Sequence, residues 1–150
     1  MKNRLIFIVD DDEVLGKSLA RFVSRLGYDA RAISNGYDVL LNMEKLRPDL
    51  IISDIRMPKL DGISLLKGLK NCKETSNIPV IFMSGYSTDK ILQDAVALGA
   101  KFFLFKPFPV EYLEDMIDLV LPEEYEVSDY PGNKPHEIEE YIIMCQKRPV

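Results

Sequence analysis

Short apolar runs alternate with segments of helical periodicity along most of this sequence. Only a few folds are compatible with this pattern. The apolar runs cover residues 5–9, 28–32, 50–53, 80–83 and 101–105. Helical periodicity covers residues 15–26, 37–45, 63–70, 88–98 and 110–120. In the first helical segment, Leu15, Leu19, Phe22 and Leu26 share one stripe, and Gly27 follows in the position of a C-terminal cap.

Five strand–helix units predict an α/β fold, a doubly wound five-stranded parallel sheet with five flanking helices. Four of the runs are apolar enough for burial on both faces, and the run over residues 28–32 is the weakest. In open sheets of this kind, ligands bind outside the carboxyl ends of the strands. The residues that directly follow the strands are therefore the first candidates for a functional site.

Bulk properties exclude several classes of protein. A chain of 150 residues, 47% of them hydrophobic, suffices for one ordinary domain with a core. With a formal net charge of −5, the chain lacks the excess of positive charge that binding a polyanion requires, so we expect no direct nucleic-acid contact. Cys72 and Cys145 form no CxxC motif or zinc cluster, and no stretch resembles a signal peptide or a membrane span. We expect a cytoplasmic protein that does not enter a membrane.

Polar residues are concentrated directly after the predicted strands. They are Asp10, Asp11 and Asp12 after the first strand, Asp54 after the third, Ser84 after the fourth and Lys106 after the fifth. Carboxylates that converge at one edge repel one another unless a cation lies among them, and Mg²⁺ is a hard cation that also binds phosphate oxygens. A carboxylate can attack phosphorus while a metal ion and a lysine neutralise the phosphoryl oxygens and a hydroxyl donates a hydrogen bond. We assign these roles to Asp54, Lys106 and Ser84.

Four segments of the sequence, IFIVDDD, IISDIRMPKLDG, VIFMS and FFLFKPF, resemble the signature segments of response regulator receiver domains in two-component signalling. The resemblance covers residues 1–121 and rests on the order and spacing of all four segments. It implies a flavodoxin-like sheet with the strand order 2-1-3-4-5. It also implies a signalling phosphoacceptor that catalyses only its own phosphorylation and dephosphorylation, and is not otherwise an enzyme.

The resemblance assigns the metal and phosphoryl ligands residue by residue. Asp54 corresponds to the phosphoacceptor, Asp11 to a direct Mg²⁺ ligand, and Asp10 to a ligand that acts through water. The backbone carbonyl of Arg56 corresponds to a further metal ligand, and Lys106 to the cation that pairs with the phosphoryl group. The acidic run also permits a shift of one residue, in which Asp11 and Asp12 form the pair. In the first alignment Asp12 is free to cap the following helix.

The same resemblance predicts a conformational switch. Phosphorylation draws the Ser84 hydroxyl inward, and an aromatic side chain at position 103 fills the space left behind. Phe103 lacks the hydroxyl of the more common tyrosine, so its rotamer depends on packing alone. The output face consists of the fourth helix, the fifth strand and the fifth helix, and a cis Lys106–Pro107 bond is a further implication.

The last thirty residues differ in composition from the rest. Residues 122–134 contain prolines and a glycine and are predicted to be a linker. Residues 135–148 are predicted to form an amphipathic helix, because Ile138, Tyr141, Ile142 and Cys145 recur at helical spacing. We expect this helix to pack on the receiver or to pair with a second copy.

We therefore predict a response regulator receiver that takes a phosphoryl group from the phosphohistidine of a sensor histidine kinase or phosphotransfer protein, with Mg²⁺ as cofactor. The switched face then controls a downstream protein or an output domain. Two alternatives stay open from the residues. The first is a phosphohydrolase of the haloacid dehalogenase type, because Asp10, Asp12 and Val14 fit its DxDx[TV] motif. The second is a degenerate receiver that acts only as a binding scaffold.

Overall fold

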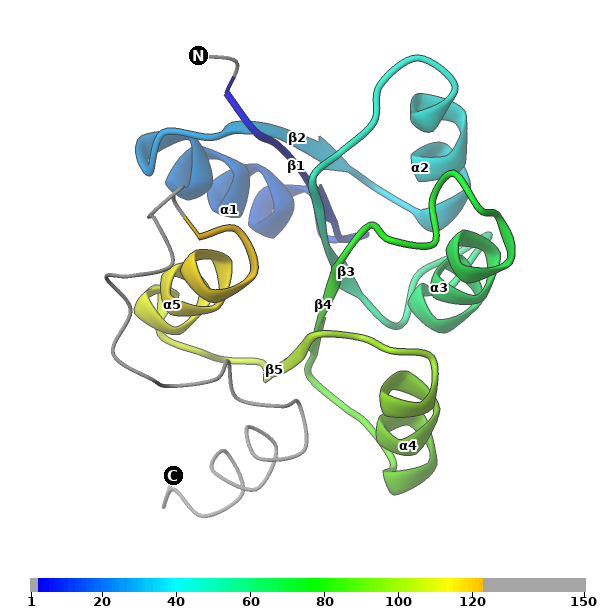
Figure 1. Cartoon of the computed structure of the whole chain (residues 1–150). Coiled ribbons are helices and arrows are strands. Elements are labelled where there is room, and N and C mark those ends of the chain that lie inside the picture. Colours follow the sequence, from blue (N-terminus) through cyan, green and yellow to red (C-terminus); the bar gives the residue numbers. More distant parts are fainter. Residues whose placement is uncertain (1–2, 123–150) are drawn as a thin grey trace, which may run out of the picture.

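Five parallel strands form one sheet in the order β2-β1-β3-β4-β5, and each strand is followed by a helix (Figure 1). This computed structural model describes residues 3–122. The strands are β1 (Leu5–Val9), β2 (Asp29–Ile33), β3 (Leu50–Asp54), β4 (Val80–Ser84) and β5 (Phe102–Phe105). The helices are α1 (Glu13–Arg25), α2 (Gly36–Met43), α3 (Gly62–Asn71), α4 (Asp89–Ala97) and α5 (Val110–Val120). The predicted doubly wound sheet with its flavodoxin-like strand order is confirmed.

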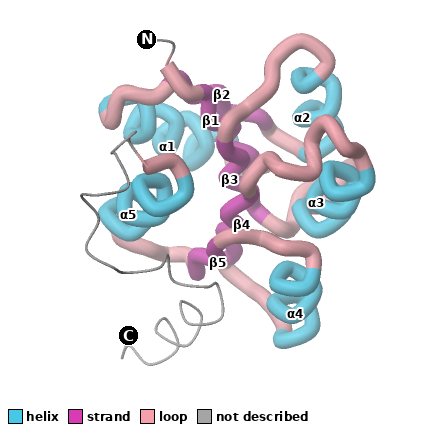
Figure 2. Tube along the Cα trace, viewed as in Figure 1, coloured by secondary structure: helices cyan, strands magenta, loops and turns pink. Residues whose placement is uncertain are grey.

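The helices lie in two layers, with α1 and α5 on one face of the sheet and α2, α3 and α4 on the other (Figure 2). Alternate residues of each strand enter the two cores that result. Ile52 on β3 packs with the cluster on the α1 and α5 side, whereas its neighbour Ile51 packs with the cluster on the opposite side. Both faces of β3 and β4 are therefore buried, which explains why these strands begin with the continuous apolar runs of residues 50–52 and 80–83.

Strand β2 is the exception, because it lies at the edge of the sheet and pairs with β1 alone. Of its five residues, only Ile33 is buried. This explains the weak apolar pattern. The strand begins and ends one residue later than predicted, because apolar and polar residues alternate only weakly there and mark its ends poorly. Edge strands with charged residues such as Asp29 and Arg31 resist pairing with other chains.

Side-chain caps and glycines mark the ends of α1 and α4. The Asp12 side chain accepts a hydrogen bond from the Leu15 N–H at 3.1 Å and caps α1. Thr88 caps α4 in the same way. Gly27 and Gly99 follow α1 and α4 with φ of +101° and +83°, a conformation that suits glycine.

The ends of the elements differ from prediction by one or two residues. Strands β3 and β4 extend to Asp54 and Ser84, because the backbones of these polar residues still pair with Met83 and Phe105 on the neighbouring strands. Strand β5 begins at Phe102, one residue late, and α2 ends at Met43, two residues early. Asp54 and Ser84 are therefore the last residues of their strands.

The linker predicted for residues 122–134 lies outside the described residues except for Pro122, and the helix predicted for residues 135–148 lies wholly outside them. Both stay predictions. Within residues 3–122, no helix has the length and apolar character needed to cross a lipid bilayer.

Gly62, the first residue of α3, packs closely against the end of β3. A Cβ atom at this position would meet the Asp54 carbonyl oxygen and would lie 2.9 Å from Cε1 of Phe82. We expect Gly62→Ala to lower the free energy of unfolding by about 1–3 kcal/mol, because the added methyl group overpacks the core. Urea unfolding monitored by circular dichroism measures the change.

Gly68 provides the matched control, because it lies in the same helix and a Cβ atom there would have nothing within 4 Å. Gly68→Ala is expected to raise the free energy of unfolding by about 0.5–1 kcal/mol, since alanine favours the helix over glycine. Changes of the same sign in the two variants would contradict the close packing at Gly62.

Candidate functional site

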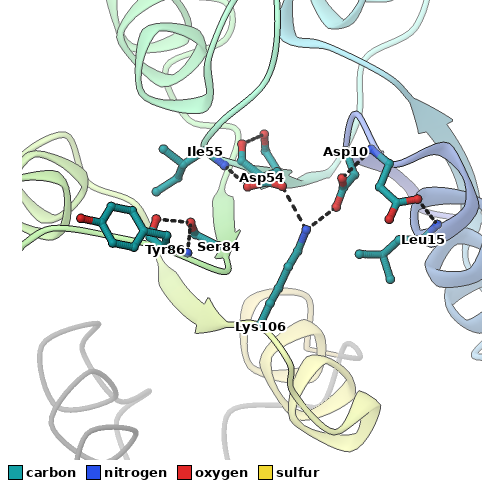
Figure 3. Close-up of polar contacts among 9 residues, drawn as sticks. Asp10, Leu15, Asp54, Ile55, Ser84, Tyr86 and Lys106 are labelled. Carbon is teal, nitrogen blue, oxygen red and sulfur yellow. Dashed lines mark hydrogen bonds and ion pairs between the residues drawn. The ribbon is translucent and has the colours of Figure 1, made fainter.

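An ion-paired cluster lies at the carboxyl ends of β1, β3 and β5 (Figure 3). The Lys106 Nζ donates a hydrogen bond to Asp10 Oδ2 at 2.6 Å and another to Asp54 Oδ2 at 3.0 Å. Asp10 follows β1, Asp54 is the last residue of β3, and Lys106 follows β5. The fold thus brings together three predicted site residues that lie far apart in the sequence.

Asp11 completes an acidic cluster. Carboxylate oxygens of Asp10, Asp11 and Asp54 lie within 4.8 Å of one another, a spacing at which they could hold one metal ion. Asp10 is buried, Asp54 is 9% exposed, and Asp11 is exposed. Asp12 is absent from this cluster, because its side chain caps α1 instead. Of the two possible acidic pairs, the structure places Asp10 and Asp11 together beside Asp54.

Local backbone contacts fix the carboxylates. Asp10 Oδ1 accepts a hydrogen bond from the Asp12 N–H at 2.9 Å, and Asp54 Oδ1 accepts one from the Ile55 N–H at 2.7 Å. The Lys106 N–H donates to the Ser84 carbonyl at 2.8 Å, and the Lys106–Pro107 peptide bond is cis. Each charged side chain is therefore held by the chain around it as well as by its ionic partner.

Burial and ion pairing oppose each other in this cluster. Burial raises the pKa of Asp10, although the hydrogen bonds from Lys106 and from the Asp12 N–H act in the opposite direction. Burial alone would lower the pKa of Lys106, but its hydrogen bonds to Asp10 and Asp54 outweigh this effect and raise the pKa. Lys106 is therefore a firmly held cation, whereas the charge on Asp10 is only partly compensated.

The raised pKa of Asp10 predicts how acidity changes the stability of the protein in metal-free buffer. A carboxyl group that binds its proton more tightly when folded makes the protein less stable as the pH rises through its folded pKa. Asp10→Asn removes this ionisation, so the variant should gain stability relative to the wild type as the pH rises above the ordinary aspartate value of 3.8. Urea unfolding at several pH values measures the difference. A difference that shrinks with rising pH would contradict the assignment.

Ser84 lies near the cluster but does not bind it. Its hydroxyl donates a hydrogen bond to the Tyr86 carbonyl at 2.7 Å and accepts one from the Tyr86 N–H at 3.3 Å. Figure 3 shows this pair to one side of Asp54. The Ser84 side chain, which is buried, must leave the Tyr86 carbonyl before it can donate to a group on Asp54.

The side chain of Arg56 makes a contact that sequence reasoning missed. Its guanidinium carbon lies 4.6 Å from the ring centroid of Tyr86, as expected for a cation–π contact. Arg56 is two residues beyond Asp54, and Tyr86 is two residues beyond Ser84. A basic residue and an aromatic residue at matching distances past adjacent strand ends were the signal available in the sequence.

Phe103, the predicted switch residue, is fully buried on β5. Its ring centroid lies 6.4 Å from that of Phe82 and 5.0 Å from that of Phe105. The aromatic side chain therefore occupies the core in this structure. Whether its position responds to a change at Asp54 stays a prediction.

Comparisons with known proteins agree with this geometry. The family model of the response regulator receiver domain matches residues 6–118. Sporulation initiation phosphotransferase F of Bacillus subtilis is 35% identical over 122 residues, which cover 81% of this chain and 97% of that protein. The DNA-binding transcriptional regulator NtrC of Proteus hauseri is 32% identical over 149 residues, which cover 99% of this chain but only 31% of that regulator.

Solved structures show the same relationship. The signal receiver domain of a signal transduction histidine kinase from Syntrophus aciditrophicus has a TM-score of 0.74 and 28% identity, over 86% of this chain and 99% of that one. The chemotaxis response regulator CheY4 of Vibrio cholerae has a TM-score of 0.73 and 26% identity, over 80% of this chain and all of that one. The sequence match, the strand order and the relatives together show that this chain belongs to the response regulator receiver domain family, the phosphoacceptors of two-component signalling.

Proposed function

We propose that this receiver accepts a phosphoryl group on Asp54 from the phosphohistidine of a sensor histidine kinase or phosphotransfer protein, in a Mg²⁺-dependent reaction. The observation that carries the proposal is the Lys106 ammonium, which binds Asp10 and Asp54 at once beside the exposed carboxylate of Asp11. We assign Asp54 as the nucleophile because its carboxylate contacts Lys106, lies within 4.8 Å of the Asp10 and Asp11 carboxylates and is more exposed than Asp10, at 9% against 2%.

The acidic cluster fits a divalent cation. Its three carboxylates face one ammonium group, so the charges of −3 and +1 leave a net charge of −2. Burial contributes most to the raised pKa of Asp10, and the charge of Asp54 adds to it. Asp10, Asp11, Asp54 and the Arg56 carbonyl would hold the ion, which would neutralise charge on the phosphoryl oxygens when bound.

The chain's own residues then account for the transfer. An Asp54 carboxylate oxygen forms a bond to phosphorus while the phosphorus–nitrogen bond of the phosphohistidine breaks, and the electron pair returns to the imidazole nitrogen. Lys106 neutralises phosphoryl oxygens from its side of the site. The Ser84 hydroxyl leaves the Tyr86 carbonyl and donates to a phosphoryl oxygen, which supplies the difference between two states that a switch requires.

We infer the output face and the setting from the same features. The output face is formed by α4, which follows Ser84 in the chain, by β5, which carries Phe103, and by α5. We expect a downstream protein or an output domain to bind this surface.

The relatives named as DNA-binding regulators are about three times as long as this chain, and no nucleic-acid contact is assigned to its own residues. Unpaired Cys72 suits the reducing cytoplasm, where we place the protein.

Intact mass spectrometry tests the proposal. The full chain is incubated with a small acyl phosphate, with and without Mg²⁺, and the protein mass and the released phosphate are followed together. We expect one phosphoryl group per chain, only when Mg²⁺ is present. Continuous release of phosphate from phosphate esters, with no phosphorylated form of the protein and no dependence on Asp54, would indicate the hydrolase. The absence of any response to Mg²⁺ would indicate the scaffold.

A further inference from the structure

Helix α2 exposes an apolar face formed by Tyr37, Leu40 and Leu41, which we call the α2 face. These side chains are 52%, 39% and 47% exposed and lie at positions i, i+3 and i+4, on one side of the helix. Val39, on the other side, is fully buried against the sheet. The other exposed large hydrophobic residues of the described chain are scattered singly, which is ordinary for a protein surface. Three together on an eight-residue helix indicate a binding surface.

Three cations lie at the edges of the α2 face. The Arg31 Nη1 donates to the Asn42 Oδ1 on α2 at 3.1 Å, and Lys45 lies just beyond the end of the helix. At the other end, Lys59 precedes Leu60, whose carbonyl accepts a hydrogen bond from the Gly36 N–H. Three acids lie in the same places, namely Asp38 in the first turn of α2, Glu44 just after its last residue, and Asp61 directly after Leu60, so the formal charges there balance. The cations at the two ends of the helix can pair with acidic side chains of an amphipathic partner.

Residues 123–150 have the matching chemistry. They contain seven acidic and three basic residues, a net charge of −4 out of −5 for the whole chain. Within them, Ile138, Tyr141, Ile142 and Cys145 repeat the i, i+3, i+4, i+7 spacing of an apolar stripe, and the three acids of residues 137–140 flank its start. Apolar side chains and negative charge thus occur together in one segment.

The segment can reach α2. The Pro122 carbonyl accepts a hydrogen bond from Arg4 Nη2 at 3.0 Å, so the described chain ends beside the start of β1. An open groove of about 600 Å³ lies there, and the residues that line it include Leu5 on β1 and Leu46, which comes after α2. Residues 123–134 span at most about 40 Å when extended, more than the diameter of a small domain.

We propose that residues 135–148 form an amphipathic helix that docks on the α2 face of the same chain. Three half-exposed side chains fall well short of the roughly 800 Å² per partner that a stable dimer buries. A tethered segment needs less area, because its effective concentration at the face is of millimolar order. The size of the face therefore favours the chain's own segment over a second copy. The proposal is independent of the chemistry at Asp54.

Cross-linking within the full chain tests the proposal. In a Cys72→Ser background, Cys145 on the predicted stripe is the one remaining thiol. Glu44→Cys adds a second thiol beside the α2 face, and Ser18→Cys adds one at an exposed position of α1, on the opposite face of the sheet (Figure 1). With a short bis-maleimide, we expect the cross-link within one chain to form at least tenfold faster for Glu44→Cys than for Ser18→Cys. Equal rates, or cross-links only between chains, would overturn the proposal.

Hydrogen exchange provides the second measurement. In the wild-type chain, backbone amides of residues 138–146 should exchange at least tenfold more slowly than in an unstructured peptide. Leu41→Ser should remove this protection, whereas Val14→Ser, a change at a 77% exposed position on α1, should leave it unchanged. Absent protection, protection that survives Leu41→Ser, or protection that rises with protein concentration would each exclude docking within one chain.

Discussion

Asp54→Asn is expected to abolish phosphorylation by a small acyl phosphate, leaving the mass of the chain unchanged after incubation with Mg²⁺. The amide has nearly the same shape as the carboxylate, so the end of β3 and the Ile55 N–H contact should persist. The uncharged amide is a poor nucleophile and a weak partner for both Lys106 and a metal ion. The loss should therefore be chemical and leave the fold intact, which circular dichroism verifies.

Asp61→Asn is the matched control for this loss. Asp61 lies in the loop after β3 and caps α3 through a hydrogen bond from the Ser64 N–H at 2.7 Å. Asparagine is an equally good cap, so this variant removes one nearby negative charge without disturbing the helix. We expect its phosphorylation to match that of the wild type. If Asp54→Asn is phosphorylated as fast as the wild type, Asp54 is not the acceptor.

Lys106→Met is expected to slow phosphorylation by about 10²–10³-fold, the usual effect of removing one group that stabilises charge in a transition state. The ammonium is held in place before any reaction, by hydrogen bonds to Asp10 and Asp54. Without it, the site loses the one ammonium group that would neutralise charge on the phosphoryl oxygens. The initial rate of phosphorylation, measured by intact mass at fixed Mg²⁺, reports the change.

The same substitution should lower the free energy of unfolding by about 1–3 kcal/mol in metal-free buffer, because Asp10 loses a charged hydrogen-bond partner. Lys106→Arg keeps the charge but not the geometry, so we expect a smaller loss of rate. Lys101→Met, at an exposed position just before β5, serves as the control for a lost surface charge. If Lys101→Met slows the reaction as much as Lys106→Met, the effect is one of overall charge and the role of Lys106 is refuted.

The fold could be predicted because each strand carries a local signal. Residues 50–52 and 80–83 are continuous apolar runs, since β3 and β4 are buried on both faces. The weak signal over β2 has the opposite cause, because one edge and much of one face of that strand are exposed. The errors in the element ends come from polar residues such as Asp54 and Ser84, whose backbones continue the ladder although their side chains interrupt the apolar pattern.

The site was predictable to the extent that strand ends determine it. Asp10, Asp54 and Lys106 meet because parallel strands finish at one edge of the sheet. Residue order alone left open whether Asp10 or Asp12 joins Asp11, and only the three-dimensional cap on α1 separates them. The stack of Arg56 on Tyr86 depends on two loop conformations, so the matching positions of the two residues past adjacent strand ends suggest the contact but do not determine it.

The most direct test of the account is to identify the phosphorylated residue chemically. The full chain is phosphorylated with an acyl phosphate and Mg²⁺, the aspartyl phosphate is reduced with borohydride, and the modified residue is located by tandem mass spectrometry of peptides. Our account predicts one modified residue, Asp54. Modification of Asp10, Asp11 or Asp12, with Asp54 unchanged, would show that the carboxylate beside Lys106 on β3 is not the acceptor.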